Sequence, residues 1–327
     1  MIRTSRLFVD ARSVVPKSIF GSSHRYLSST QVSNSTVGFL GLGNMGLPMA
    51  INLSKTYDVL TFDLTKSSMA KANEQGIASA DSIETVAKGA ATIVTMLPSD
   101  AAVDAVMKKI MGSCRENTTI IDCSTVSPTT SRYWNDMLGA EGHLFVDAPV
   151  SGGVKGAENA TLTFMVGSNE NTMAVRIQPI LDCMGQRVIA CGGPGAGAAV
   201  KLCNNLALAA QMVGICEAMN LGEALGVDPI ILANVMNTST AKSWSCEINN
   251  PHPAVAALSN SPASKDYAGG FGSRLMLKDL GLAVSAGSQA HVALPLGNTT
   301  KELYQLAEAR GLGDRDFGVI LQFLKGK

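Results

Sequence analysis

Residues 36–53, T-V-G-F-L-G-L-G-N-M-G-L-P-M-A-I-N-L, decide the fold of this chain. A short apolar run of strand type precedes Gly41, Gly43 and Gly46, and apolar residues at helical spacing follow them. Strand, G-x-G-x-x-G and helix in that order form the fingerprint of a dinucleotide-binding turn. The glycines allow a tight turn, a close approach of the pyrophosphate and close packing of helix on strand, and the free N–H groups at the helix start attract phosphate. The alternative is a glycine-rich turn that binds nothing.

A second apolar run, residues 59–62, ends at Asp63, about twenty residues after the glycines. A carboxylate at this place accepts a hydrogen bond from the ribose 2′-hydroxyl of NAD and repels the 2′-phosphate of NADP. Only Lys66 offers a cation nearby, so we expect NAD as the cofactor, although Asp63 could also be a plain surface carboxylate. The predicted cofactor contacts in this region are Gly41, Leu42, Gly43, Asn44, Met45, Gly46 and Asp63.

The composition excludes several classes of partner. The 26 basic and 26 acidic side chains cancel, which gives no electrostatic reason to expect nucleic acid or an anionic membrane. No apolar run approaches the roughly 20 residues of a membrane span. The seven cysteines are scattered without a C-x-x-C, which is typical of reduced intracellular thiols. The four histidines form no cluster, and we expect no metal site.

Residues 1–33 differ from the rest of the chain. They are rich in serine and carry five basic residues against the single acid Asp10. This is the composition of a transit peptide, and R-Y-L-S at 25–28 resembles a matrix-processing site with cleavage after Leu27. We expect delivery to the mitochondrial matrix rather than a plastid. A disordered tail without an address is the alternative.

From residue 34 to 195 short apolar runs alternate with helical stretches, which predicts a doubly wound, Rossmann-type parallel sheet with helices on both faces. Ligands of such α/β sheets bind at the carboxyl ends of the strands. Asp63, residues 97–98, residues 124–125 and residues 149–153 fall there. The predicted strands are 37–40, 59–62, 92–97, 119–123 and 144–147, with 162–166 and 187–190 as two further candidates.

After residue 195 the strand signal stops. Residues 198–225 read as one long helix, buried on most sides, that joins the sheet to an all-helical domain spanning 196–327. The uniform apolar content of this interdomain helix suggests the core of a homodimer or homotetramer. Further helices are predicted at 229–236, 271–287, 295–310 and 315–324, with a loop at 249–268.

Lys201 and Asn205 lie four residues apart in the long helix, so both face the same side. Polar groups in an otherwise apolar helix are costly unless they have partners. Burial lowers the pKa of a lysine and makes it a candidate general acid and base, and Asn205 could hold the ammonium or a substrate hydroxyl. A lysine facing solvent at a helix start is the alternative.

The chain resembles the β-hydroxyacid dehydrogenase family from about residue 36 to its end. The motifs that carry the resemblance are the glycine turn at 37–50, M-L-P-S at 96–99, I-D-C-S-T-V-S-P at 121–128, D-A-P-V-S-G-G-V at 147–154, G-A-G-A-A-V-K-L-C-N-N at 195–205 and G-G-F-G-S-R-L-M-L-K-D-L-G-L-A at 269–283. Segments 244–253 and 316–324 resemble the hydroxyisobutyrate branch, which implies NAD-dependent oxidation of a small hydroxyacid to a semialdehyde in valine breakdown.

The resemblance also implies roles for individual residues. Lys201 would be the catalytic residue, with Asn205 assisting it. Ser151, Gly152 and Gly153 would hold the substrate carboxylate and Ser124 would contact the substrate, while Leu97, Pro98, Thr125 and Lys278 would contact the cofactor.

Simpler interpretations stay open for two of these groups. A hydroxyl beside unshielded N–H groups suits a carboxylate, but residues 151–153 could be an ordinary strand-to-helix turn. Lys278 could form a solvated ion pair with Asp279, and Phe271 is expected to pack rather than bind. Alanine at 160, where the family usually has glycine, puts the local loop shape in doubt, and Ala102 replaces an asparagine that often reaches the cofactor.

Two rival functions also stay open. One is a related reductase that acts on tartronate, glyoxylate or succinate semialdehyde. The other is a non-catalytic NAD-binding protein.

Overall fold

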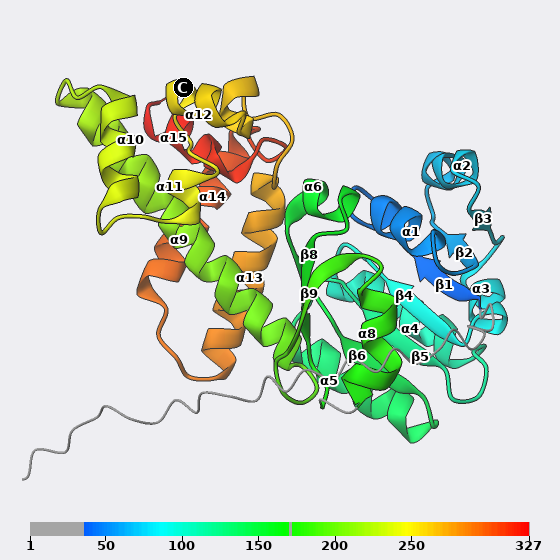
Figure 1. The fold of residues 1–327 in the computed structure, drawn as a ribbon. Coiled ribbons are helices and arrows are strands. Elements are labelled where there is room, and N and C mark those ends of the chain that lie inside the picture. The colour runs from blue at the N-terminus through cyan, green and yellow to red at the C-terminus, as the bar shows by residue number, and fades with distance from the viewer. Residues whose placement is uncertain (1–35, 170–171, 327) are drawn as a thin grey trace, which may run out of the picture. The chain divides into compact units, whose positions relative to one another are not determined.

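The computed structural model describes residues 36–169 and 172–326, apart from the side chain of residue 174 (Figure 1). The leader predicted at 1–33 lies outside these residues.

A six-stranded parallel sheet is the centre of the first part of the fold. Its strand order is β3-β2-β1-β4-β5-β6. Strands β2 and β3 are thus added on one side of β1 and strands β4 to β6 on the other, so the order of the strands reverses between β1 and β4. Val37 pairs with Val59 on one side and with Thr92 on the other, which leaves the glycine turn at this switch point. Dinucleotides bind at such a point in doubly wound folds. The strands are β1 Val37–Leu40, β2 Val59–Phe62, β3 Ala78–Ser79, β4 Thr92–Thr95, β5 Thr119–Asp122 and β6 Leu144–Asp147.

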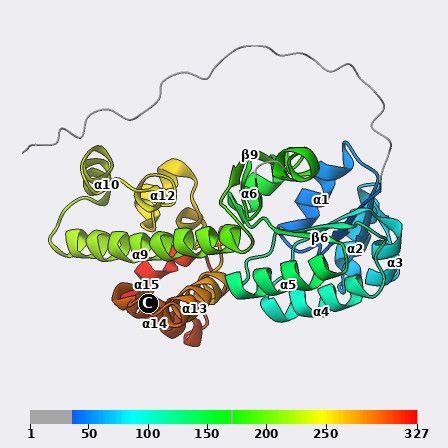
Figure 2. The same cartoon turned by 90° about the horizontal axis from the view of Figure 1, so that it is seen from below.

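Two apolar cores cover the two faces of this sheet because neighbouring strand residues point to opposite sides. Phe39 belongs to the core that contains Met49 of α1, whereas Leu40 belongs to the core that contains Met107 of α4 and Trp134 of α5. In Figure 2, α4 and α5 lie together on one face. Ser82, Ser99 and Ser127 cap α3, α4 and α5 by accepting a backbone N–H bond in the first turn. The helices are α1 Gly46–Ser54, α2 Lys66–Glu74, α3 Ile83–Gly89, α4 Asp100–Met111 and α5 Pro128–Ala140.

The two further candidate strands at 162–166 and 187–190 are confirmed as strands, but they belong to a separate three-stranded sheet and not to the six-stranded one. β7 Val150–Ser151 pairs antiparallel with β8 Leu162–Val166, which pairs parallel with β9 Gly185–Ala190. Pro149 has no N–H to extend the ladder after β6, so the chain leaves the first sheet there. α6 Gly153–Glu158, a π-helical turn Met173–Ile177 and α8 Gln178–Leu181 complete this region.

The described residues from 196 to 326 form helices and connecting loops, and the helices pack around α9 Ala196–Ala224. The predicted loop at 249–268 is wrong in part, because Pro253 at a helix start and the side chain of His252, which accepts from Ala254 N, begin α12. The predicted helix at 315–324 is divided into a 3₁₀ turn and a short helix. The elements are α10 Pro229–Thr238, α11 Trp244–Glu247, α12 Pro253–Ser259, a 3₁₀ turn Pro262–Lys265, α13 Ser273–Gln289, α14 Pro295–Ala309, a 3₁₀ turn Phe317–Val319 and α15 Ile320–Leu324.

α9 is less buried than the sequence predicts. Its buried side includes Lys201, Asn205 and Met212, whereas Val200 and Leu221 lie exposed on the other side. Contrary to the sequence-based expectation, α9 has the length and mean hydropathy of a membrane span. In the structure it packs against α13, α14 and α15, so its buried side is covered by protein.

Candidate active site

The glycine turn has the shape that a dinucleotide requires. Gly41 has φ +97°, a conformation that favours glycine, and a Cβ at Gly46 would collide with the carbonyl oxygen of Gly41. Gly43 is exposed, and a Cβ there would meet nothing within 4 Å. The turn is therefore tight where helix meets strand and open at the glycine that a pyrophosphate approaches. The residues of this turn therefore fit a dinucleotide cofactor, because Gly43 leaves room for the pyrophosphate.

Asp63 lies beside the same turn. Its Oδ2 accepts a hydrogen bond from Leu42 N and its Oδ1 accepts one from Thr65 N, both at 2.6 Å. These bonds hold the carboxylate at the end of β2, next to the turn that would carry the pyrophosphate. Among the other predicted contacts, Asn44 is exposed and Met45 packs on the core below α1.

The loops after β4 and β5 are joined by hydrogen bonds. Ser124 N donates to Asp122 Oδ1 at 3.1 Å, and Ser124 Oγ accepts from Leu97 N at 2.8 Å. Thr95 Oγ1 also donates to Asp122 Oδ1, at 2.7 Å. Ser124 is only 1% exposed, so its position suits holding the 97–98 loop better than direct contact with a substrate. Burial raises the pKa of Asp122, whose Oδ2 has no partner among the described residues.

Asp147, at the end of β6, holds the beginning of α9. Its Oδ1 accepts from Gly195 N and its Oδ2 from Ala198 N, both at 2.8 Å. Burial raises the pKa of Asp147, while these backbone donors favour its charged form and partly offset that effect. Lys201 follows within one turn of Ala198, so this carboxylate fixes the lysine relative to the sheet.

Lys201 belongs to a buried polar cluster. It is 9% exposed, which excludes the alternative of a lysine that faces solvent. Burial lowers the pKa of Lys201, the charge of Lys278 lowers it further, and Asp279 opposes both effects. A lysine with a lowered pKa can give and take a proton near neutral pH.

Asp279 organises this cluster. Its Oδ2 accepts from Asn205 Nδ2 at 2.6 Å, and its Oδ1 lies 3.3 Å from Lys278 Nζ. The Asp279 side chain is 3% exposed and that of Lys278 is 28% exposed, so this pair has a buried carboxylate and differs from the solvated ion pair considered above. Lys278 Nζ also donates to Thr125 O at 2.8 Å, which connects α13 to the loop after β5. Lys201, Asn205, Lys278 and Thr125 are thus brought together.

The predicted carboxylate turn lies on the second sheet. Ser151 pairs with Thr163, and the exposed Gly152 and Gly153 have φ +137° and +63°. No hydrogen bond connects this turn directly to Lys201 among the described residues, and β8 contacts both β7 and α9. Phe271 packs edge-to-face on Phe317, as expected.

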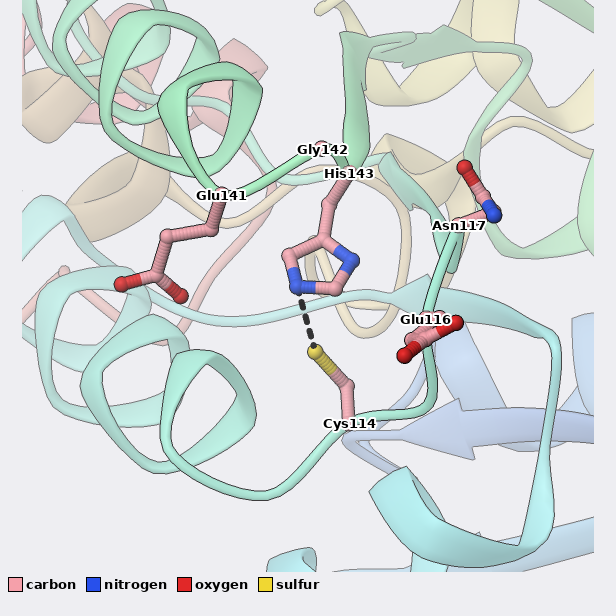
Figure 3. A pocket seen from close by; sticks show the side chains of 6 residues that line it. All are labelled: Cys114, Glu116, Asn117, Glu141, Gly142 and His143. Carbon is pink, nitrogen blue, oxygen red and sulfur yellow. Dashed lines mark hydrogen bonds between the residues drawn. The ribbon is translucent and has the colours of Figure 1, made fainter.

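A surface hollow of about 410 Å³ lies elsewhere (Figure 3). Cys114 Sγ and His143 Nε2 approach to 3.3 Å in it. Both residues precede the amino ends of strands β5 and β6, whereas the site described above lies at the carboxyl ends. Burial raises the pKa of the Cys114 thiol, which disfavours the reactive thiolate.

Comparison with known proteins agrees with this geometry. Residues 36–193 match the family described as the NAD binding domain of 6-phosphogluconate dehydrogenase, and residues 195–324 match the family described as NAD-binding of NADP-dependent 3-hydroxyisobutyrate dehydrogenase. A probable mitochondrial 3-hydroxyisobutyrate dehydrogenase of Dictyostelium discoideum is 45% identical over 304 residues, which cover 92% of this chain and 93% of that protein. The chain belongs to the 3-hydroxyisobutyrate dehydrogenase family.

Two further relatives of this chain are connected with L-serine by name. The structure of Mycobacterium tuberculosis 3-hydroxyisobutyrate dehydrogenase with L-serine has a TM-score of 0.84 at 38% identity, and the match covers 89% of this chain and 99% of that one. An NAD-dependent L-serine dehydrogenase of Pseudomonas aeruginosa is 38% identical, over 87% of this chain and 96% of that protein. The expected Rossmann-type fold, NAD cofactor and dehydrogenase class are confirmed.

Sequence reasoning missed three carboxylates of the site: Asp122, Asp147 and Asp279. The first two stand at strand ends within quoted motifs, and that position is the signal that could have identified them. Asp279 was noted only as a surface partner of Lys278, because its contact with Asn205 joins residues 74 positions apart.

Proposed function

We propose that this protein oxidises 3-hydroxyisobutyrate to methylmalonate semialdehyde with NAD. The observation that carries the proposal is the buried Lys201, one turn beyond the start of α9, beside an asparagine that Asp279 holds in place. A lysine this desolvated is costly to fold and suits proton transfer. The relatives supply the substrate class, and the cluster supplies the group that their reaction requires.

The roles of the residues follow from their chemistry. Lys201 Nζ takes the proton of the substrate hydroxyl during oxidation and returns it in the reverse reaction. Asn205 orients that hydroxyl because Asp279 fixes its amide. Ser151 and the N–H groups of the glycines after it hold the carboxylate. NAD, when bound, accepts the hydride from the carbinol carbon.

L-Serine is a second candidate substrate, because one relative is named for it and another was solved with it. Both molecules are 3-hydroxy acids, and they differ at the second carbon, which carries a methyl group in one and an amino group in the other. The amino group needs a hydrogen-bond acceptor, whereas the methyl group needs an apolar contact.

A substrate panel tests the proposal. Formation of NADH from NAD, or of NADPH from NADP, is followed with 3-hydroxyisobutyrate, L-serine and other hydroxyacids. The reverse reaction is followed with tartronate semialdehyde, glyoxylate and succinate semialdehyde. We expect the highest kcat/KM for 3-hydroxyisobutyrate with NAD. A higher value for L-serine would reassign the substrate, and NADH binding without turnover of any of them would leave a non-catalytic NAD-binding protein.

We further propose that residues 1–33 direct the chain to the mitochondrial matrix, where the reaction would serve valine breakdown. The mitochondrial name of the Dictyostelium relative supports this proposal. Import into isolated mitochondria followed by N-terminal sequencing tests it, with Ser28 expected as the new first residue. An unprocessed chain that stays outside would contradict it.

We also propose a division into an NAD-binding part, 34–195, and a helical part, 196–327, that associates into a homodimer or homotetramer. The two family matches meet between residues 193 and 195, which supports the boundary. Exposed apolar side chains on α9, α10 and the turn between them, such as Leu221, Leu225 and Ile231, support association. Light scattering at the outlet of a sizing column measures the mass of the particle, and a monomer at micromolar concentration would refute the proposed association.

A further inference from the structure

Asn52, near the end of α1, connects this helix to α6. Its side chain is buried, at 4% exposure. Asn52 Nδ2 donates to Ala157 O at 2.6 Å and to Glu158 O at 3.2 Å, and its Oδ1 accepts from Lys55 Nζ at 2.6 Å. Both amide hydrogens and the amide oxygen are therefore used. The described residues contain no other hydrogen bond between the two helices.

The two helices meet at the ends that lie away from the site. α1 begins at Gly46, in the cofactor turn, and Asn52 lies near its other end. α6 begins at Gly153, in the carboxylate turn, and its last residues supply the two carbonyls. The views in Figures 1 and 2 both show α1 and α6 side by side, and the two helices are in contact. Each helix thus links the Asn52 contact to one of the two turns.

The chemistry of this contact needs an asparagine. The carbonyl groups at the end of a helix lack partners within the helix, and a buried amide is stable only when it is hydrogen-bonded. Asn52 satisfies both needs at once. An aspartate of the same size would place an acceptor against two acceptors, whereas an apolar residue would leave both carbonyls without a donor.

We propose that Asn52 is a positioning residue that couples the cofactor turn to the carboxylate turn, so that the substrate carboxylate is held in register with bound NAD. The inference rests on the proposed function, because it takes the 151–153 turn as the carboxylate site. α6 is only six residues long and begins in that turn, so fixing its last residues against α1 also fixes the turn. Asn52 itself touches neither ligand.

The test compares Asn52→Asp with Lys55→Met. Lys55→Met removes only the bond to the amide oxygen and serves as the matched control, since Lys55 is exposed. For Asn52→Asp we expect KM for 3-hydroxyisobutyrate to rise by about fivefold or more, because the loss of the two hydrogen bonds to α6 lets the 151–153 turn leave its position, and interactions of this strength shift an equilibrium on that scale. We expect kcat and the Kd for NADH, measured by fluorescence, to change by less than about twofold, and Lys55→Met to behave like the wild type.

A second measurement needs no substrate. Amide hydrogen exchange of residues 151–162 is followed with and without NADH, and the wild type should show protection of the turn when NADH binds. Asn52→Asp should lose most of that protection, and Lys55→Met should keep it. This measurement also gives a result if 3-hydroxyisobutyrate proves not to be the substrate. Failure of the proposed coupling can therefore be distinguished from failure of the proposed function.

Two results would overturn the inference. One is a wild type whose turn gains no protection from NADH, which can be measured even if Asn52→Asp does not fold. Another is an Asn52→Asp variant that loses thermal stability while KM and protection stay at wild-type values, because Asn52 would then only stabilise the end of α6.

Discussion

Replacing Lys201 by methionine should stabilise the protein while it abolishes most of its activity. Methionine is close to lysine in length, so Lys201→Met removes the charge with little change in packing. Wild-type Lys201 is 9% exposed, and the desolvation that lowers its pKa outweighs the attraction of Asp279. We expect a gain of about 1–2 kcal/mol in the free energy of unfolding, a typical result when strain at a functional site is relieved. For a chain of this size that corresponds to roughly 2–4 °C in Tm.

Activity should change in the opposite direction. Loss of a general base lowers kcat by about 10²-fold or more, whereas the Kd for NADH should stay within about twofold, because the expected cofactor contacts are retained. Urea denaturation measures stability, and stopped-flow NADH formation measures turnover. Lys88→Met is the matched control, since Lys88 is exposed on α3, and it should leave stability within about 0.5 kcal/mol and kcat unchanged.

The stability gain should also depend on pH, and its sign follows from the lowered pKa. Between the folded and unfolded pKa values the unfolded lysine binds more protons than the folded one, so wild-type stability rises with pH in that window. The advantage of Lys201→Met is therefore full below the folded pKa and shrinks as pH rises toward the unfolded value of about 10.4. Full turnover in Lys201→Met would remove the lysine from the mechanism. A loss of stability at neutral pH would show that Asp279 more than compensates for burial.

Three further predictions concern other residues. Ala160→Gly should raise the free energy of unfolding in urea by about 1 kcal/mol, because Ala160 has φ +54°, a left-handed conformation that glycine adopts without a steric penalty; an unchanged midpoint would contradict this. Asp63→Ala should weaken NADH binding by about tenfold and narrow the preference over NADPH, measured by fluorescence titration of both; an unchanged ratio of the two Kd values would exclude Asp63 from cofactor choice. Asp147→Asn should cost about 1–3 kcal/mol of stability in the same urea assay, since its amide group cannot accept from both backbone donors at the start of α9; full stability would show that one acceptor suffices.

Local patterns predicted the first sheet well. The bounds of β1, β2 and β6 agree with those predicted, because each is a largely apolar run and a glycine or an aspartate stands at or directly after its last residue. β7 has only two residues, too few to show any periodicity, and its antiparallel pairing depends on where Pro149 turns the chain. The second sheet was therefore missed as a separate unit.

The site was predictable where its residues are close in sequence. The spacing of Lys201 and Asn205 placed both on one helix face, and both are buried there. What holds them was not predictable, since Asp279 is far away in the chain. The substrate contact expected of Ser124 stays a prediction, and the hydrogen bond that its hydroxyl accepts from Leu97 N, 27 positions away, was not predictable from the motif.

The attachment of α9 to β6 has a consequence for how this family can diversify. Because the Asp147 carboxylate accepts hydrogen bonds from Gly195 N and Ala198 N, the first turn of α9 is attached to β6, and the proposed proton-transferring amine of Lys201 is held relative to the six-stranded sheet. The later helices could then be exchanged between relatives to change which hydroxyacid is accepted, without moving the amine. Chimeras joined just after Asn205 would retain this anchorage, provided that the incoming α13 supplies an aspartate in the place of Asp279.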